Sequence, residues 1–205
     1  MPFAVATLSF IAFVAYFVCL VSLHFLPTGY SPLYNTISDF SVGRFSRLAR
    51  MSVAVNGVGT LLLLGAFVTV VGSPPLPWNG LIWLVILACT RLGMVGFITD
   101  VSGQKITGRG IIHMILTVIS FVAGVSALST ITQTLGTLSE WSSMYPILKL
   151  LAQVSFPILI AVLITLVVPT LRKIFGLVER AFLLAINLWL LVSSGVLIVA
   201  AELHH

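Results

Sequence analysis

Charged side chains are scarce in this sequence. Lysine, arginine, aspartate and glutamate together make up 7% of the 205 residues, whereas hydrophobic residues make up 59%. A soluble domain carries roughly 25% charged residues, so there are too few charges here to cover a water-exposed surface. Most of the exterior must therefore face hydrocarbon. The length suits one compact domain over residues 1–205.

Cysteines and basic clusters are also few. Cys19 and Cys89 both lie within apolar stretches, which indicates small buried side chains and excludes a disulfide framework. The net charge is +5, but no basic run or basic face with interleaved aromatics occurs, so no nucleic-acid partner is expected. The N-terminus has no basic segment before its apolar run, so we expect the first stretch to be kept as a membrane span.

What the sequence does contain is long apolar stretches bounded by proline, glycine or charge. A membrane-spanning helix needs about 20 mostly apolar residues, and continuous runs of this length form helices rather than barrel strands. The pattern predicts an all-α fold, a polytopic membrane helix bundle with about six transmembrane helices. The predicted spans are approximately 4–25, 51–72, 80–99, 110–132, 146–170 and 180–201.

Basic residues are distributed unevenly among the connections. The side that carries the two termini has only Lys149, at the edge of the fifth span. Basic residues in short loops stay in the cytoplasm. We therefore expect a multi-pass protein of the cell membrane with both termini outside the cytoplasm. The basic residues of the other side are Arg44, Arg47, Arg50, Lys105, Arg109, Arg172, Lys173 and Arg180.

Arg91 stands in the middle of the third span, before Asp100 at its end. At 1.5 Å per residue it lies about 13 Å deeper than the cytoplasmic end of that helix. A guanidinium at this depth needs a partner, a water-filled cavity or an anionic ligand. One interpretation is capture of a phosphate or carboxylate group, in a cavity among the third, fourth, fifth and sixth spans. The other is a structural ion pair or a side chain that reaches back to the interface.

The same topology brings further polar residues to the cytoplasmic boundary. Ser38 and Asp39 lie in the long first connection, and with Arg91 they are our candidate substrate-binding residues. Ser38 and Asp39 also have an ordinary structural explanation, because serine and aspartate often cap helices.

Three other residues at this boundary have the types that bind metals. His113, Asp100 and His24 match the three protein ligands that catalytic zinc usually takes. Asp100 can equally cap its own turn, His113 can be a hydrogen-bonded packing residue, and His24 can interact with the end of its helix.

Two segments carry a family resemblance. One is Tyr34-Asn35-Thr36-Ile37-Ser38-Asp39-Phe40, and the other is Gly96-Phe97-Ile98-Thr99-Asp100-Val101-Ser102-Gly103, continuing through Thr107 and Gly110 to His113. Together they resemble the membrane family known as domain of unknown function 998. The resemblance implies a six-helix prokaryotic membrane protein and no established reaction. Ile98 stands where proline is common in that family.

A more distant likeness is to the CREST hydrolases, membrane enzymes that use serine, aspartate and histidines around zinc. This likeness implies such roles for Ser38, Asp100 and His113. The chain departs from the pattern, because those enzymes resemble seven-helix bundles with three histidine ligands.

These observations predict an integral membrane protein that binds or moves a lipid-like or anionic small molecule at a cytoplasm-facing site, with membrane lipids as partners. Three alternatives stay open. The first is a zinc-dependent membrane hydrolase acting on lipid at the inner leaflet, where the metal would make hydroxide available. The second is a haem protein with His24 and His113 as axial ligands. The third is an accessory subunit that binds a protein partner or forms a homo-oligomer.

Overall fold

The computed structural model describes residues 1–71, 75–101 and 104–203, and within these residues the chain is helical and has no strand. Six helices in the described part are long and apolar enough to cross a membrane, which confirms the predicted bundle. They are α1 (Pro2–Phe25), α2 (Ser46–Ala66), α3 (Trp78–Gly96), α4 (Gly108–Leu135), α5 (Tyr145–Val167) and α6 (Phe175–Leu203). The short helical segments are η1 (Ser38–Ser41), η2 (Phe67–Val71), η3 (Ser139–Trp141) and η4 (Pro169–Ile174).

The helix boundaries differ from the predicted spans mainly at the starts of α2 and α6. Each begins five residues earlier than expected, at Ser46 and Phe175. The reason is that both helices start with a polar turn that hydropathy does not count as part of a span. At its other end the second span continues as the π-helical segment η2 to Val71; the predicted end at 72 lies outside the described residues.

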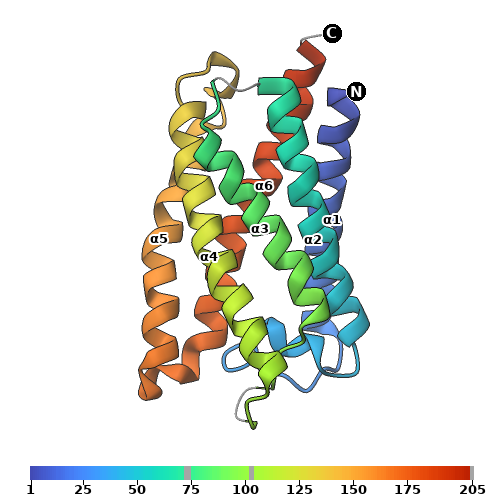
Figure 1. Cartoon of the computed structure of the whole chain (residues 1–205), viewed down its shortest axis with the longest axis vertical. Coiled ribbons are helices and arrows are strands. Elements are labelled where there is room, and N and C mark those ends of the chain that lie inside the picture. The colour runs from blue at the N-terminus through green and yellow to red at the C-terminus, as the bar shows by residue number, and fades with distance from the viewer. Residues whose placement is uncertain (72–74, 102–103, 204–205) are drawn as a thin grey trace.

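The six helices form a closed ring. Each helix packs against the next in sequence, and α6 packs against α1 to complete the circle. Helix α6 also contacts α2 and α4, so it lies furthest inside the bundle. The N-terminus and the last described turn of α6 lie at the same end (Figure 1), as expected for an even number of crossings.

The opposite end carries the connections 26–45 and 168–174 and the described residues of the connection 97–107 (Figure 1). We call it the basic end. All eight of the basic residues used for the orientation prediction lie in these connections or in the first two turns of the helices that follow them. Whether this end faces the cytoplasm stays a prediction.

The apolar core includes a cluster of aromatic rings in the half of the bundle nearer the termini. Phe67 stacks on Trp141 with ring centroids 5.9 Å apart, and Trp189 of α6 lies against the same ring of Phe67 at 6.2 Å. Both tryptophans are almost completely buried. The Trp189 indole donates a hydrogen bond to Oγ1 of Thr132 at 2.9 Å, which satisfies the one polar atom that this side chain buries.

Close approach of α2 and α3 depends on Gly57. A Cβ atom at this position would lie 2.8 Å from Cγ of Leu92, so glycine lets the Leu92 side chain of α3 pack directly against the backbone of α2. Asn56 and Arg91 precede these two residues in sequence. The contact therefore brings the Asn56 amide within reach of the Arg91 guanidinium.

Candidate functional site

Two neighbouring cavities open inside the half of the bundle nearer the basic end. The first has a volume of about 80 Å³ and includes Arg91 and Asn56 in its wall. The second has a volume of about 270 Å³ and extends between α4, α5 and α6. The residues that line both are Ser38, His113, Thr117, Phe121 and Glu179. These shared residues form the wall between the two cavities.

Ser38 and His113 are joined by a hydrogen bond in that wall. Nδ1 of His113 lies 2.7 Å from the carbonyl oxygen of Phe97, and Nε2 lies 3.1 Å from Oγ of Ser38. A carbonyl only accepts, so Nδ1 carries the proton; in the neutral ring Nε2 then accepts from the serine hydroxyl. The bond links η1 to α4 across 75 residues of sequence.

Hydrogen bonds of the neighbouring residues Ile37 and Asp39 fix the position of Ser38. The backbone N–H of Ile37 donates to Oε2 of Glu179 at 2.7 Å, which attaches the connection to α6. The Asp39 carboxylate accepts from the backbone N–H of Thr36 and from Nδ2 of Asn35, each at 3.0 Å. Asp39 thus stabilises the turn that precedes η1, although it also borders the second cavity.

Arg180 provides a second attachment of the same connection. Its Nη1 donates to the carbonyl oxygens of Pro32 and Asn35 at 2.8 and 2.6 Å. Its Nε donates to Nε2 of His24 at 2.9 Å, and its guanidinium lies 5.7 Å from the centre of the Phe40 ring. The first turns of α6 therefore hold the segment that carries Ser38.

Arg91 is buried, with 6% of its surface exposed. Its Nη1 donates to Oδ1 of Asn56 and to Oγ1 of Thr60, the latter at 3.3 Å. Nδ2 of Asn56 donates onward to Oδ1 of Asn187 at 2.8 Å, and Nδ2 of Asn187 lies 3.4 Å from the Tyr16 hydroxyl. These side chains form a polar layer that joins α1, α2, α3 and α6.

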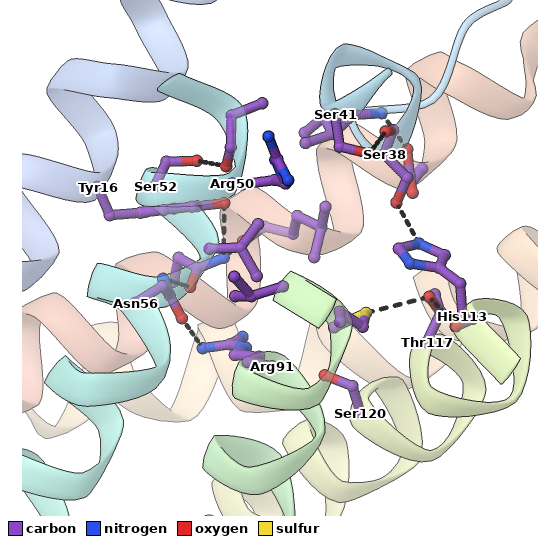
Figure 2. A pocket seen from close by; sticks show the side chains of 18 of the residues that line it. Tyr16, Ser38, Ser41, Arg50, Ser52, Asn56, Arg91, His113, Thr117 and Ser120 are labelled. Atoms are coloured by element: carbon purple, nitrogen blue, oxygen red, sulfur yellow. Dashed lines mark hydrogen bonds between the residues drawn. The ribbon is translucent and has the colours of Figure 1, made fainter. Parts of the chain in front are cut away.

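The guanidinium of Arg91 has hydrogen-bond donors that no described residue accepts. Within the described part of the chain its partners are the neutral groups of Asn56 and Thr60, and no carboxylate pairs with it. An arginine has five N–H donors, and Nε and Nη2 make no hydrogen bond to the described residues. Figure 2 shows the first cavity, with Arg91 and Asn56 on one side of it and Ser38 and His113 on the other.

The position of the Arg91 cavity corrects one expectation. We predicted a cavity among the third to sixth spans, but Tyr16 and Leu23 of α1 and Asn56 of α2 also line it. The reason is the closure of the ring, which brings α1 and α2 against α6.

Asp100 stabilises the start of α4. Its Oδ2 accepts from the backbone N–H of Thr107 at 2.7 Å, and its Oδ1 accepts from the Thr107 hydroxyl at 2.9 Å. The oxygen of that hydroxyl in turn accepts from the N–H of Gly110 at 3.1 Å, as a helix cap does. The sequence-based alternative was a cap of the turn 100–103, but residues 102 and 103 lie outside the described residues.

The three candidate metal ligands are not brought together. Among the described residues, no three histidine, cysteine, aspartate or glutamate side chains are close enough to hold a metal ion. His24 is exposed and makes two hydrogen bonds, from Nδ1 to the carbonyl of Leu20 at 2.7 Å and at Nε2 with Arg180. Both ring nitrogens of His113 are engaged as well. A zinc or haem role would require each histidine to give up one of these bonds.

Sequence reasoning overlooked four residues of the site. Glu179 was treated as the polar boundary of the sixth span, yet it is 3% exposed and lines both cavities. Asn56, Asn187 and Tyr16 are buried in the polar layer. An asparagine inside an apolar span is a usable signal, because polar side chains in a membrane are usually hydrogen-bonded across helices.

Comparison with known proteins identifies a family. No curated protein and no solved structure shows significant similarity to the chain. A family model described as a protein of unknown function, DUF998, matches residues 10–196. That range includes all of α2 to α5, most of α1 and α6, and both segments on which the resemblance was based. The chain is therefore a member of the DUF998 family of membrane-type proteins.

Proposed function

We propose that this protein binds a small amphipathic anion, an apolar chain that ends in a phosphate or carboxylate, in the cavities near its basic end. The observation that carries the proposal is the buried Arg91 guanidinium, which lines a cavity and has neutral partners and donors that no described residue accepts.

The electrostatic argument starts from the cost of a buried charge. Moving a guanidinium out of water costs free energy. An opposite charge or several well-placed acceptors are needed to offset this desolvation cost. Asn56 and Thr60 supply two neutral acceptors. A phosphate or carboxylate in the cavity would satisfy the remaining donors of Arg91 in the paired geometry that guanidinium favours.

The shape and chemistry of the cavities support an amphipathic ligand. Arg50 lines the first cavity together with Arg91, so two cations and one carboxyl group, that of Glu179, border it. The second cavity has an apolar part and a polar part. Besides Ser38 and His113, its polar lining consists of Thr36, Asp39, Thr99, Asp100, Thr117 and Glu179. Its apolar lining includes Val118, Val122, Leu159, Val162, Leu163 and Leu166.

We further propose that the ligand enters from the cytoplasm or the inner leaflet. Eight basic residues surround the end of the bundle nearest the cavities, and basic loops are kept on the cytoplasmic side of a membrane. The proposal covers binding; the same site would serve a carrier that moves its ligand between leaflets.

Native mass spectrometry of the full chain tests the proposal. The probes are dioctanoyl phosphatidic acid and dioctanoylglycerol, which share their acyl chains and differ in charge. We expect wild-type protein to bind the anionic lipid at least tenfold more tightly. Arg91→Leu should remove this preference, whereas Arg91→Lys should keep part of it, because the charge is retained without the planar donor set.

A matched control separates the cavity from the surface. Arg109 is an exposed basic residue at the same end, so Arg109→Leu removes one positive charge outside the cavities and should leave the preference within twofold of wild type. Equal affinity of wild-type protein for the two lipids would overturn the proposal even if Arg91→Leu failed to fold. So would an unchanged preference in a folded Arg91→Leu variant.

A further inference from the structure

We infer that Ser38 is a nucleophile with His113 as its general base, and that the protein cleaves or transfers the acyl group of an ester bound in its cavities. The inference deepens the proposed function and rests on it for the identity of the substrate.

The first support is the geometry of the Ser38–His113 pair. An activated serine needs a base within about 2.6–3.2 Å, and the base needs a third group that orients it. Nε2 of His113 lies 3.1 Å from Oγ of Ser38, and the Phe97 carbonyl accepts the proton of Nδ1 at 2.7 Å. The carbonyl holds the ring in the tautomer whose Nε2 can accept the serine proton.

The second support is where the pair lies. Ser38 and His113 line both cavities, so a carbonyl carbon in either one can approach Oγ. His113 is 7% exposed, which keeps bulk water away from the base. A serine with an ordinary capping role would bond to backbone of its own helix, as Ser41 does with the Ser38 carbonyl.

The third support is the rigidity of the attachment. Ser38 is preceded by Ile37, whose N–H is held by Glu179, and followed by Asp39, whose carboxylate holds the preceding turn. A nucleophile on a short connection needs such supports, because its oxygen must stay within a fraction of an ångström of the reacting carbon.

The reaction is redox-neutral and balances as acyl transfer. Oγ of Ser38 attacks the ester carbonyl carbon while its proton passes to Nε2 of His113. The bond from carbon to the leaving oxygen then breaks, and His113 donates the proton to the departing alcohol. Water completes the cycle: it attacks the acyl-serine, gives one proton to His113 and releases a carboxylic acid, and the proton returns to Ser38.

Each of the two cavities would bind a different part of the substrate. The apolar part of the cavity between α4, α5 and α6 fits the acyl chain, and the cavity with Arg91 and Arg50 fits an anionic group on the alcohol portion. The ester would then lie at the wall that contains Ser38. The substrate class is an acyl ester of a small anionic alcohol.

The test is covalent labelling with an alkyl fluorophosphonate, on the full-length protein in lipid nanodiscs. Ser38 attacks phosphorus, the phosphorus–fluorine bond breaks and fluoride leaves, with the proton taken by His113. We expect one label per chain, located at Ser38 by peptide mass spectrometry. Ser38→Ala should abolish the labelling, and the labelling rate of His113→Asn should fall at least tenfold.

His113→Asn is chosen because asparagine keeps an N–H that can donate to the Phe97 carbonyl but has no atom equivalent to Nε2. Its loss of labelling therefore reports the missing base rather than a displaced helix. Ser22→Ala is the matched control, because the Ser22 hydroxyl donates to the Val18 carbonyl of its own helix and should be dispensable. Labelling of wild type no faster than Ser38→Ala would overturn the inference, as would a wild-type rate in His113→Asn.

The two proposals fail separately. The lipid preference reports on Arg91 and the labelling reports on Ser38 and His113, and both are measured on the wild-type chain. An unlabelled wild type that shows this preference would overturn the nucleophile and leave the anion site standing. A labelled wild type without the preference would overturn the anion site and leave the serine–histidine pair in place.

Discussion

The Glu179 carboxylate and the backbone N–H of Ile37 form a 2.7 Å hydrogen bond, although 142 positions separate the two residues in the sequence. The bond attaches the first turns of α6 to the residue that precedes Ser38. The position of Ser38 relative to His113 therefore depends on α6, although neither residue belongs to that helix.

Glu179→Gln should preserve both stability and fluorophosphonate labelling, because the amide oxygen can accept from the Ile37 N–H. Glu179→Ala should lower stability by about 1–3 kcal/mol, the cost of a buried N–H without a partner. It should also slow labelling, since the connection loses one support. Thermal unfolding in detergent and the labelling rate measure the two effects. An equal loss of stability and labelling rate in the two variants would show that these properties depend on the negative charge of Glu179 and not on its hydrogen bond.

Gly176→Ala should displace the same connection from α6. A Cβ atom at Gly176 would lie 2.3 Å from the carbonyl oxygen of Asn35, and backbone cannot yield as a flexible side chain can. Overpacking of this kind costs about 1–3 kcal/mol. Gly96→Ala is the control, because nothing lies within 4 Å of its added Cβ. The melting temperature of Gly176→Ala should be clearly lower than that of Gly96→Ala. Equal melting temperatures would contradict the close approach of Gly176 to the Asn35 carbonyl.

The Arg91–Asn56 pair should behave as a coupled unit. Asn56→Leu removes an acceptor and leaves a buried charge with less compensation, so it should destabilise wild type strongly. The same substitution should cost much less in an Arg91→Leu background, where no charge remains. A double-mutant cycle by chemical unfolding should give a coupling of about 0.5–3 kcal/mol. Additive effects would mean that Arg91 does not depend on Asn56.

Thr107→Val should weaken the start of α4. The substitution removes the hydroxyl that donates to Asp100 and accepts from the N–H of Gly110, and loss of a helix cap costs about 1 kcal/mol. Thr107→Ser keeps the hydroxyl and should stay near wild type. Melting temperatures of the two variants make the comparison, and identical values would remove Thr107 as a cap.

The orientation of the bundle can be tested with single cysteines. In a background without Cys19 and Cys89, we place one cysteine at exposed Lys105, at the basic end, and another at exposed Glu140, at the opposite end. A membrane-impermeant maleimide added to intact cells should label the cysteine at 140 and not the one at 105. The reverse pattern would overturn the cytoplasmic location of the basic end.

Hydropathy was sufficient to find the helices but not their polar first turns. The six spans follow from apolar length alone, because hydrocarbon accepts only segments whose backbone bonds are internal. The first turns of α2 and α6 contain Arg47, Arg50, Glu179 and Arg180, and these charges hid five helical residues in each case. The oversight mattered most for Glu179, which proved to be buried at the site.

The sequence by itself determined an all-helical bundle with six membrane-spanning helices. It also placed the charged side chain of Arg91 deep in the bundle, where it needs compensating partners. Finally, it placed Ser38, Asp39, Asp100 and His113 toward one end of the bundle. Only the tertiary structure decided which of these meet: Ser38 with His113, Asp100 with Thr107, and Arg91 with Asn56. The physical reason is rotation about the helix axis. In a membrane the lipid-facing and protein-facing sides of a helix are both apolar, so hydropathy specifies how deep a residue lies but not the direction in which its side chain points.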